Sequence, residues 1–287
     1  MLTFNKWLVG LDNTDMDKNL FRFINSDNKP ITYQELYFLH IAHSVGLTDK
    51  VTQQNDVNDG VAKIEEELEN KIRENLPGKD FKLIVMHGNP AKDLIKISKD
   101  LDPDLLVLGR KPISGAEGVI PEELVAVSNC STLLLPGYTS YSFENIMAAI
   151  DFSKISKSAL LTAKEIANNT GAKLQVQHVC MIPSDFRRTG KSYEEYADKQ
   201  QSIAEKKAKD FFQDLQSEPE IHYTFADKNE TADSIAAFVN EHNADLVIMG
   251  SKGRTNAAAV LLGSVAEQTA KNLADVPLMV IKEKNAN

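Results

Sequence analysis

Cysteine and tryptophan are nearly absent from this chain of 287 residues, which contains two cysteines and one tryptophan. Two cysteines, Cys130 and Cys180, cannot build a disulfide framework, and so sparse a use of cysteine is typical of a reducing compartment. No apolar run approaches the roughly 20 residues that cross a bilayer, and the first residues lack the layout of a signal peptide. We therefore expect a cytoplasmic protein without a membrane-spanning segment.

Positive charge is also scarce, because 32 Lys and Arg residues stand against 41 Asp and Glu residues, for a net charge of −9. Such a balance argues against a broad nucleic-acid or acidic-membrane surface. The hydrophobic content of 42% and the charged content of 25% are those of a globular protein. A chain of this length has room for two domains, each with its own core.

The chain carries one pattern twice. An apolar strand ending in Asp12 matches one ending in Asp151, 139 positions later, and a strand ending in Gly109 matches one ending in Gly250, 141 positions later. A period near 140 residues indicates a duplicated domain, since solenoid repeats are far shorter. We predict domains at residues 1–137 and 141–284, joined by a short hinge near residues 136–140.

Predicted strands and helices alternate in both halves, which indicates right-handed crossovers and a parallel sheet covered on both faces. The first half has a weakly helical first crossover at residues 13–32, and its predicted strands are Lys6–Asp12, Glu35–Ala42, Phe81–His87, Asp104–Gly109 and Thr132–Leu135. The second half is predicted to contain strands Asn145–Asp151, Lys173–Val179, Ile221–Ala226, Asp245–Gly250 and Leu278–Ile281. Its predicted helices are Ser156–Asn169, capped by Ser156 and followed by Gly171, a charged helix within Tyr193–Leu215, Thr231–His242 and Gly263–Leu273.

A glycine loop follows the fourth strand of the second half, with the spacing Gly250-x-x-Gly253-(nine)-Gly263-Ser264. Glycines let backbone N–H groups approach a phosphate, and the start of the next helix adds donors at Ser264 and Val265. Lys252 and Arg254 are candidates to contact the outer phosphates, although such side chains are more often solvated surface charges. The glycines can also be turn residues and Ser264 a helix cap, but the whole arrangement favours a nucleotide site.

Ligands of open doubly wound sheets lie at the carboxyl ends of the strands. Asp151 ends the first strand of the second half, where its carboxylate can accept hydrogen bonds from a sugar or a base, although a cap is an equally good interpretation. His178 and Val179 end the second strand, where the backbone can border a base, and His178 itself is better explained as a structural residue.

The residues Asp151-Phe152-Ser153, Gln177-His178-Val179 and the Gly-x-x-Gly-(nine)-Gly-Ser loop resemble the universal stress protein family. The resemblance is strong over residues 143–282 and weak over 4–136. It implies two tandem doubly wound α/β domains with parallel five-stranded sheets of the adenine nucleotide α-hydrolase-like, Rossmann-like kind, packed as a pseudo-dimer. It also implies ATP as the ligand, with or without Mg²⁺, bound by positions that match Asp151, Val179, Met249, Gly250, Gly253, Gly263, Ser264 and Val265.

The first half departs from this pattern after Gly109. Its loop is about five residues shorter, Pro112 removes an N–H donor, and Glu117 places a negative charge where phosphate oxygens would lie. The following helix begins with the acidic pair Glu122-Glu123, which repels an anion. We therefore predict that the first half does not bind ATP, and that Asp12 is a remnant or a cap.

Other candidate motifs are weak. Thr189-Gly190-Lys191-Ser192 lacks the upstream glycine of a P-loop, and His40 and His43 would point to opposite faces of a strand. No nucleophile elbow or zinc-protease motif occurs. We predict an ATP-binding regulatory protein with little or no hydrolysis, and we leave open a slow ATP hydrolase, a nucleotide-independent interaction module, a homodimer and an unknown protein partner.

Overall fold

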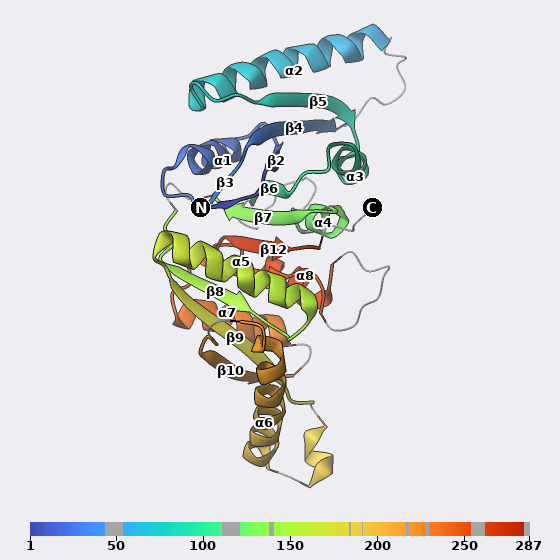
Figure 1. Cartoon of the computed structure of the whole chain (residues 1–287). Helices are drawn as coiled ribbons and strands as arrows, with labels where there is room; N and C mark the ends of the chain where they lie inside the picture. The colour runs from blue at the N-terminus through green and yellow to red at the C-terminus, as the bar shows by residue number, and fades with distance from the viewer. Residues whose placement is uncertain are drawn as a thin grey trace. The chain divides into compact units, whose positions relative to one another are not determined.

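The computed structural model divides the chain into two compact units, Met1–Ser142 together with Glu283, and Phe143–Lys282 (Figure 1). The structure describes residues 1–43, 54–110, 121–137, 141–183, 185–190, 192–215, 218–227, 230–253 and 262–283.

The first unit is built on five parallel strands in the order β7-β6-β2-β4-β5. Their bounds are β2 Lys6–Leu11, β4 Glu35–His43, β5 Lys82–Gly88, β6 Leu105–Arg110 and β7 Ser131–Pro136. Two further strands, β1 (Leu2–Thr3) and β3 (Ile31–Thr32), pair with each other in parallel. The unit's helices are α1 Met16–Asn25, α2 Gln54–Asn75, α3 Pro90–Leu101 and α4 Pro121–Val127.

The second unit repeats this order as β10-β9-β8-β11-β12, again with parallel pairing. The strands are β8 Asn145–Ala149, β9 Lys173–Met181, β10 Ile221–Ala226, β11 Leu246–Gly250 and β12 Leu278–Ile281. The helices are α5 Lys154–Thr170, α6 Tyr193–Phe212, α7 Thr231–Glu241 and α8 Ser264–Asn272, with a short 3₁₀ turn η1 at Phe186–Thr189. The expected fold, two doubly wound α/β domains in tandem, is confirmed.

The strand order reverses once in each unit, and this decides which face each helix covers. In the second unit the chain moves from β8 outward to β9 and β10, then returns past β8 to β11 and β12. Since the crossovers are right-handed, α5 and α6 cover one face, and α7 and α8 cover the other. The contacts between α7 and α8 and between α5 and β8 and β11 agree with this arrangement. The carboxyl ends of β8 and β11 therefore meet at the reversal, where doubly wound folds bind ligands.

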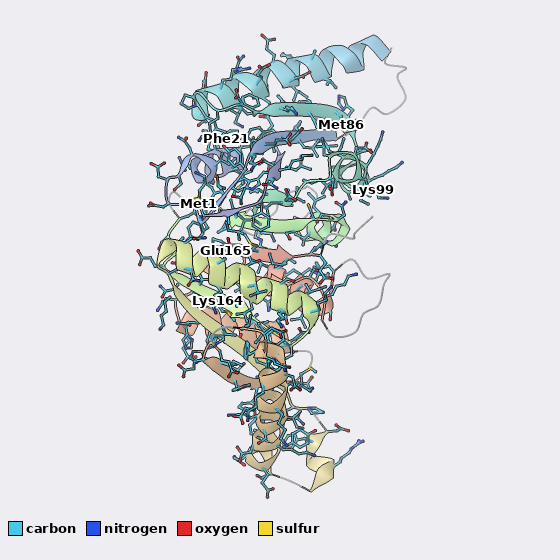
Figure 2. All side chains as sticks on the ribbon, viewed as in Figure 1. Met1, Phe21, Met86, Lys99, Lys164 and Glu165 are labelled. Carbon is cyan, nitrogen blue, oxygen red and sulfur yellow. The ribbon has the colours of Figure 1, made fainter. Side chains whose placement is uncertain are left out.

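Burial on both faces explains the apolar composition of the central strands. Trp7, Leu8 and Val9 of β2 are fully buried, and so are Leu246, Val247 and Ile248 of β11. In the first unit Phe21 of α1 lies against Phe38 of β4, with ring centroids 5.8 Å apart, inside the layer of side chains that Figure 2 shows.

The two units share details that go beyond the order of their strands. His40 Nδ1 lies 3.0 Å from the carbonyl oxygen of Leu11, and His178 Nδ1 lies 2.8 Å from that of Ile150. Asp104 accepts a hydrogen bond from the backbone N–H of Lys6, as Asp245 does from that of Asn145. These equivalent contacts indicate that both units descend from one duplicated domain.

Three local predictions were wrong. The first crossover of the first half contains a regular helix, α1, because Leu20, Phe23 and Ile24 form a buried stripe that outweighs its polar residues. Helix α5 is capped by Ser153, whose side chain accepts from the backbone N–H of Ser156, so Ser156 lies within the helix. Strand β9 continues to Met181, beyond the predicted end at Val179.

Candidate functional site

The glycine loop of the second unit begins at the carboxyl end of β11 and returns to the same place before α8. The backbone N–H of Gly263 donates to the carbonyl oxygen of Ser251 over 2.7 Å, and Ser251 N–H donates to Ile281 over 2.9 Å. The two ends of the loop are therefore held together and against β12. Arg254, predicted to contact phosphate, lies outside the described residues.

Gly253 lies directly against the side chain of Asp151. A Cβ atom added at Gly253 would be 2.9 Å from Asp151 Oδ2, closer than a side chain tolerates without movement. The other carboxylate oxygen, Oδ1, accepts from the backbone N–H of Ser153 over 3.0 Å. Asp151 therefore shapes its own turn and also faces the glycine loop, so both interpretations of this residue are compatible with the structure.

Gly263 is the second glycine of the loop whose backbone lies close to neighbouring atoms. A Cβ atom there would lie 3.3 Å from the carbonyl oxygen of Ser251 and 3.5 Å from Lys252 Cα. Gly263 is also the N-cap of α8, with an extended backbone conformation, and it has no side chain to bond the first amides of the helix. Ser264 is exposed and Val265 is half-buried at this helix start. Backbone donors at a helix N-terminus suit an anion, and this helix offers them beside the glycine loop.

Met249 and Val179, which the family pattern places at the site, lie in strands of the sheet and not in the glycine loop itself. Met249 is 5% exposed and pairs with Ala149 and Val280 in the sheet, so its side chain belongs to the core. Val179 is half-buried on β9, one residue after His178. The backbone N–H of Ile150 donates to Gln177 over 2.9 Å, which places this part of β9 beside the end of β8.

Sequence reasoning missed Phe152 as a structural part of the site. Its φ of 63° lies in the left-handed region, which is unusual for a large side chain. The centroid of its ring lies 4.2 Å from the ring centroid of His178 and 5.4 Å from that of Phe211 on α6. Asn13, the residue that follows Asp12 in the first domain, shares this conformation with a φ of 57°. A backbone angle is not visible in the sequence, so no sequence signal marked Phe152.

Comparison with known proteins decides the family. Residues 3–136 and residues 142–282 each match the model of the Universal stress protein family. The chain belongs to the universal stress protein family. It contains two domains of that family in tandem, as the resemblance implied.

Relatives of this universal stress protein differ in how much of the chain they match. Universal stress protein MJ0577 of Methanocaldococcus jannaschii is 25% identical over 162 residues, which are 51% of this chain and 99% of that protein. MJ0531 of the same organism is 44% identical over 52 residues, or 18% of this chain and 30% of that protein. The crystal structure of a universal stress protein from Archaeoglobus fulgidus has a TM-score of 0.65 and 20% identity, and the match covers 100% of both chains.

A nucleotide is present in one smaller member of the family. The structure of the Arabidopsis thaliana protein At3g01520 was solved with AMP bound, and it is 17% identical over 47% of this chain and 93% of its own, with a TM-score of 0.32.

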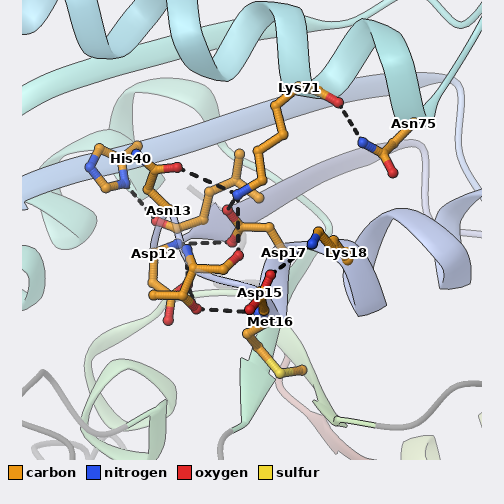
Figure 3. A network of polar contacts seen from close by, with 11 residues as sticks. Asp12, Asn13, Asp15, Met16, Asp17, Lys18, His40, Lys71 and Asn75 are labelled. Atoms are coloured by element: carbon orange, nitrogen blue, oxygen red, sulfur yellow. Dashed lines mark hydrogen bonds and ion pairs between the residues drawn. The ribbon is translucent and has the colours of Figure 1, made fainter.

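The first universal stress protein domain fills the corresponding corner with an ion pair (Figure 3). Asp17, which is 1% exposed, accepts from Lys71 Nζ over 2.8 Å and from the backbone N–H of Asp12 over 3.1 Å. Lys71 also reaches the carbonyl oxygen of Thr14 over 3.1 Å. Burial, the largest influence, raises the pKa of the Asp17 carboxyl although the Lys71 ammonium acts in the opposite direction. The second domain has Ser156 at the position of Asp17, and no such ion pair is described there.

The Asp12 carboxylate takes the role of a cap in the first domain. Its Oδ1 accepts from the backbone N–H of Thr14 over 3.0 Å and from the Thr14 hydroxyl over 2.6 Å. The predicted differences at Pro112 and Glu117 lie outside the described residues.

Metal and thiol chemistry have little support at this site. Within the described ranges, no group of three or more His, Cys, Asp or Glu side chains is placed to hold a metal ion. Burial raises the pKa of the Cys180 thiol to about 11, so the thiolate is a minor species at neutral pH. None of the helices in the described part of the chain is long and apolar enough to cross a membrane.

Replacing Lys71 by Met should lower the free energy of unfolding by about 3 kcal/mol at neutral pH, because the buried Asp17 carboxylate would lose its compensating charge. The pKa of Asp17 in the folded protein is raised above its ordinary value of 3.8. In the pH window between these two pKa values, the carboxyl is protonated in the folded protein and ionised in the unfolded chain. Stability from this group is therefore lost as the pH rises through that window. Without Lys71 the folded pKa rises further, so the deficit should shrink in acid, which chemical denaturation at several pH values would measure.

Two controls make the Lys71 experiment specific. Lys18→Met removes the exposed ion pair of Lys18 with Asp15 (2.8 Å) and should lower the free energy of unfolding far less than Lys71→Met does. The double variant Asp17→Ser/Lys71→Met recreates the residue of the second domain and should recover most of the loss. A Lys71→Met variant as stable as the wild type at neutral pH would contradict the account.

Replacing Gly250 by Ala should destabilise the second domain by about 1–3 kcal/mol through overpacking. The added Cβ would lie 2.9 Å from Ile155 Cγ2 and 3.2 Å from the Ser156 backbone nitrogen, where α5 begins. Urea denaturation would measure the change. Gly60→Ala in α2 is the matched control, since no described atom lies within 4 Å of the added Cβ, and a helical Gly→Ala change should stabilise by about 0.5–1 kcal/mol.

Proposed function

We propose that the second domain binds ATP at the carboxyl ends of β8 and β11, and that the first domain does not. The protein then acts as a nucleotide-dependent regulatory protein and not as an enzyme with rapid turnover. The observation that carries this proposal is the position of Gly253, whose backbone lies against the Asp151 carboxylate where a Cβ atom would be 2.9 Å from Oδ2.

The glycine positions support the choice of a phosphate group as the part of the ligand held by the loop. Gly253 and Gly263 have no side chains to crowd Asp151 and Ser251, so the backbone stays close to these residues, and Gly263 leads directly into α8. The backbone amides of Gly253, Ser264 and Val265 would hold phosphate oxygens, with the Ser264 hydroxyl as a further donor. Lys252, half-buried beside Gly253, would add positive charge.

Asp151 and Val179, which lie outside the glycine loop, are suited to contact an adenosine group. Asp151 would accept hydrogen bonds from the sugar or the base, and the backbone at Val179 would border the base, as the family pattern implies. The Asp151 carboxylate is already oriented by Ser153 N–H, so little side-chain freedom would be lost on binding. AMP is the ligand of the Arabidopsis relative, and ATP is the more specific part of our proposal for this chain.

The ion pair of the first domain supports binding by the second domain alone. The carbonyl of Thr14 and the carboxylate of Asp17 both bind Lys71, whereas the second domain has Ser156 at the position of Asp17. The acidic and proline-containing loop sequence after Gly109 adds to this difference.

A regulatory role fits the chemistry of the groups that would surround the phosphates. Backbone amides, a serine hydroxyl and a lysine stabilise negative charge, but none of them is a general base that activates water. The carboxylate of Asp151 is assigned to the adenosine side by the family pattern.

Titration of the purified chain with a fluorescent ATP analogue should show one site per chain. Asp151→Asn and Gly263→Val should each weaken binding at least about tenfold, or about 1.4 kcal/mol, because the first removes a charged acceptor and the second fills the loop. The matched control Asp12→Asn should leave binding unchanged. Two sites per chain, or equal losses in Asp12→Asn and Asp151→Asn, would show that the second domain is not the sole site.

Steady-state phosphate release from ATP should stay well below about 1 s⁻¹, the lower range of ordinary enzymes. The measurement is made on wild type beside Gly263→Val, so that a contaminating ATPase is recognised by activity that survives in the variant. Turnover above that rate that disappears in Gly263→Val would replace the regulatory role by that of an ATP hydrolase.

A further inference from the structure

Two histidines of the second domain lie together at a corner that the nucleotide site does not use. His222 is near the start of β10, at the edge of the sheet, and His242 follows the last residue of α7 (Figure 1). Their ring centroids are 5.3 Å apart, and the ring of Phe238 stacks on His242 at 3.8 Å and contacts His222 at 5.2 Å. Both histidines are half-buried, so water and ions reach them.

The hydrogen bonds leave nitrogen lone pairs at this corner. His242 Nδ1 lies 3.1 Å from the carbonyl oxygen of Phe238, so this nitrogen carries the proton in the neutral ring and Nε2 has the lone pair. A backbone carbonyl in this position is the usual partner of a metal-binding histidine, because it fixes the tautomer and the ring orientation. The ring of His222 makes no hydrogen bond within the described part of the chain.

The fold does not require histidine at either place, as the first domain shows. His40 and His178 are equivalent, so the residues before them, Leu39 and Gln177, are equivalent too. Leu39 pairs with Ile84, and Gln177 pairs with His222. Ile84 is therefore the first domain's equivalent of His222. Leu101 precedes the left-handed Asp102 at the end of α3, as His242 precedes the left-handed Asn243. The first domain therefore has an isoleucine and a leucine at the two equivalent positions, and the two imidazoles are a feature of the second domain alone.

We propose that His222 and His242 form a binding site for one divalent transition-metal ion of the Zn²⁺ class. Imidazole nitrogen is a preferred ligand of Zn²⁺, Ni²⁺ and Cu²⁺, whereas Mg²⁺ and Ca²⁺ prefer oxygen. Two imidazoles bound to one tetrahedral ion at 2.0–2.1 Å place their ring centroids roughly 5 Å apart, close to the separation seen here. Water completes the coordination, and the ion links the edge strand β10 to the end of α7.

The site is independent of the proposed ATP site and differs from a catalytic zinc centre in having two protein ligands in place of three. Its expected effect is to stabilise the second domain, since an ion that binds only the folded state shifts the unfolding equilibrium toward that state. Protons compete for the same lone pairs, so affinity should fall as the solution becomes more acidic.

Calorimetric titration of the full chain with ZnCl₂, in a non-chelating buffer without nucleotide, tests the proposal. Wild type should bind one ion, and His222→Gln and His242→Gln should each weaken binding at least about tenfold. The double variant His222→Ile/His242→Leu, which carries the residues of the first domain, should fold and lose both the binding and the rise in Tm that Zn²⁺ causes in wild type.

His87→Gln, on the edge strand β5 of the first domain, is the matched control and should bind like wild type. The proposal is overturned if wild type shows no saturable binding, if the double variant still binds, or if His87→Gln loses binding to the same extent. Because no nucleotide is present, none of these results changes the conclusion about the ATP site.

Discussion

The close approach of the Gly253 backbone to the Asp151 carboxylate is the contact on which the candidate site depends. It joins the end of the first strand of the second domain to the loop after the fourth strand, across the point where the strand order reverses. A Cβ atom at this position would lie 2.9 Å from Oδ2, so any other residue would require the Asp151 carboxylate to shift. The hydrogen bond from Gly263 to Ser251 then closes the loop and brings the start of α8 to the same corner.

The two domains show how one frame can hold different chemistry. Both retain the histidine that bonds the carbonyl at the end of the first strand, and both retain an aspartate followed by a left-handed residue. The first domain adds Asp17 and Lys71, whose ion pair fixes α2 against the loop after β2, whereas the second has Ser156 and an aromatic contact between Phe152 and Phe211. A buried ion pair satisfies polar groups within the protein, and groups so satisfied are less available to a ligand.

Several features were correctly predicted because they follow from local patterns. The alternation of apolar strands with helices, the period near 140 residues and the placement of the glycine loop before a helix predicted the tandem α/β fold. The cap at Gly171 was also predictable, since its φ of 76° suits glycine. The helix α1 was underestimated because its burial depends on the sheet beneath it, and Ser153 was overlooked as a cap in favour of Ser156. The predicted pairing of the two domains as a pseudo-dimer stays a prediction, and so do the domain limits and the contribution of Arg254.

The amino-acid sequence by itself determined the duplication, the order of strands and helices, and the residue types that can border a nucleotide, because these properties depend on neighbours along the chain. The contact of Asp151 with Gly253, the internal ion pair of Asp17 with Lys71 and the meeting of His222 with His242 were decided by the tertiary structure alone. Each contact joins residues at least 20 positions apart in the chain. Asp17 and Lys71 are 54 positions apart and lie on two different helices. No local pattern records such distances, because they arise only when the crossovers bring separate strands and helices to the same corner of the sheet.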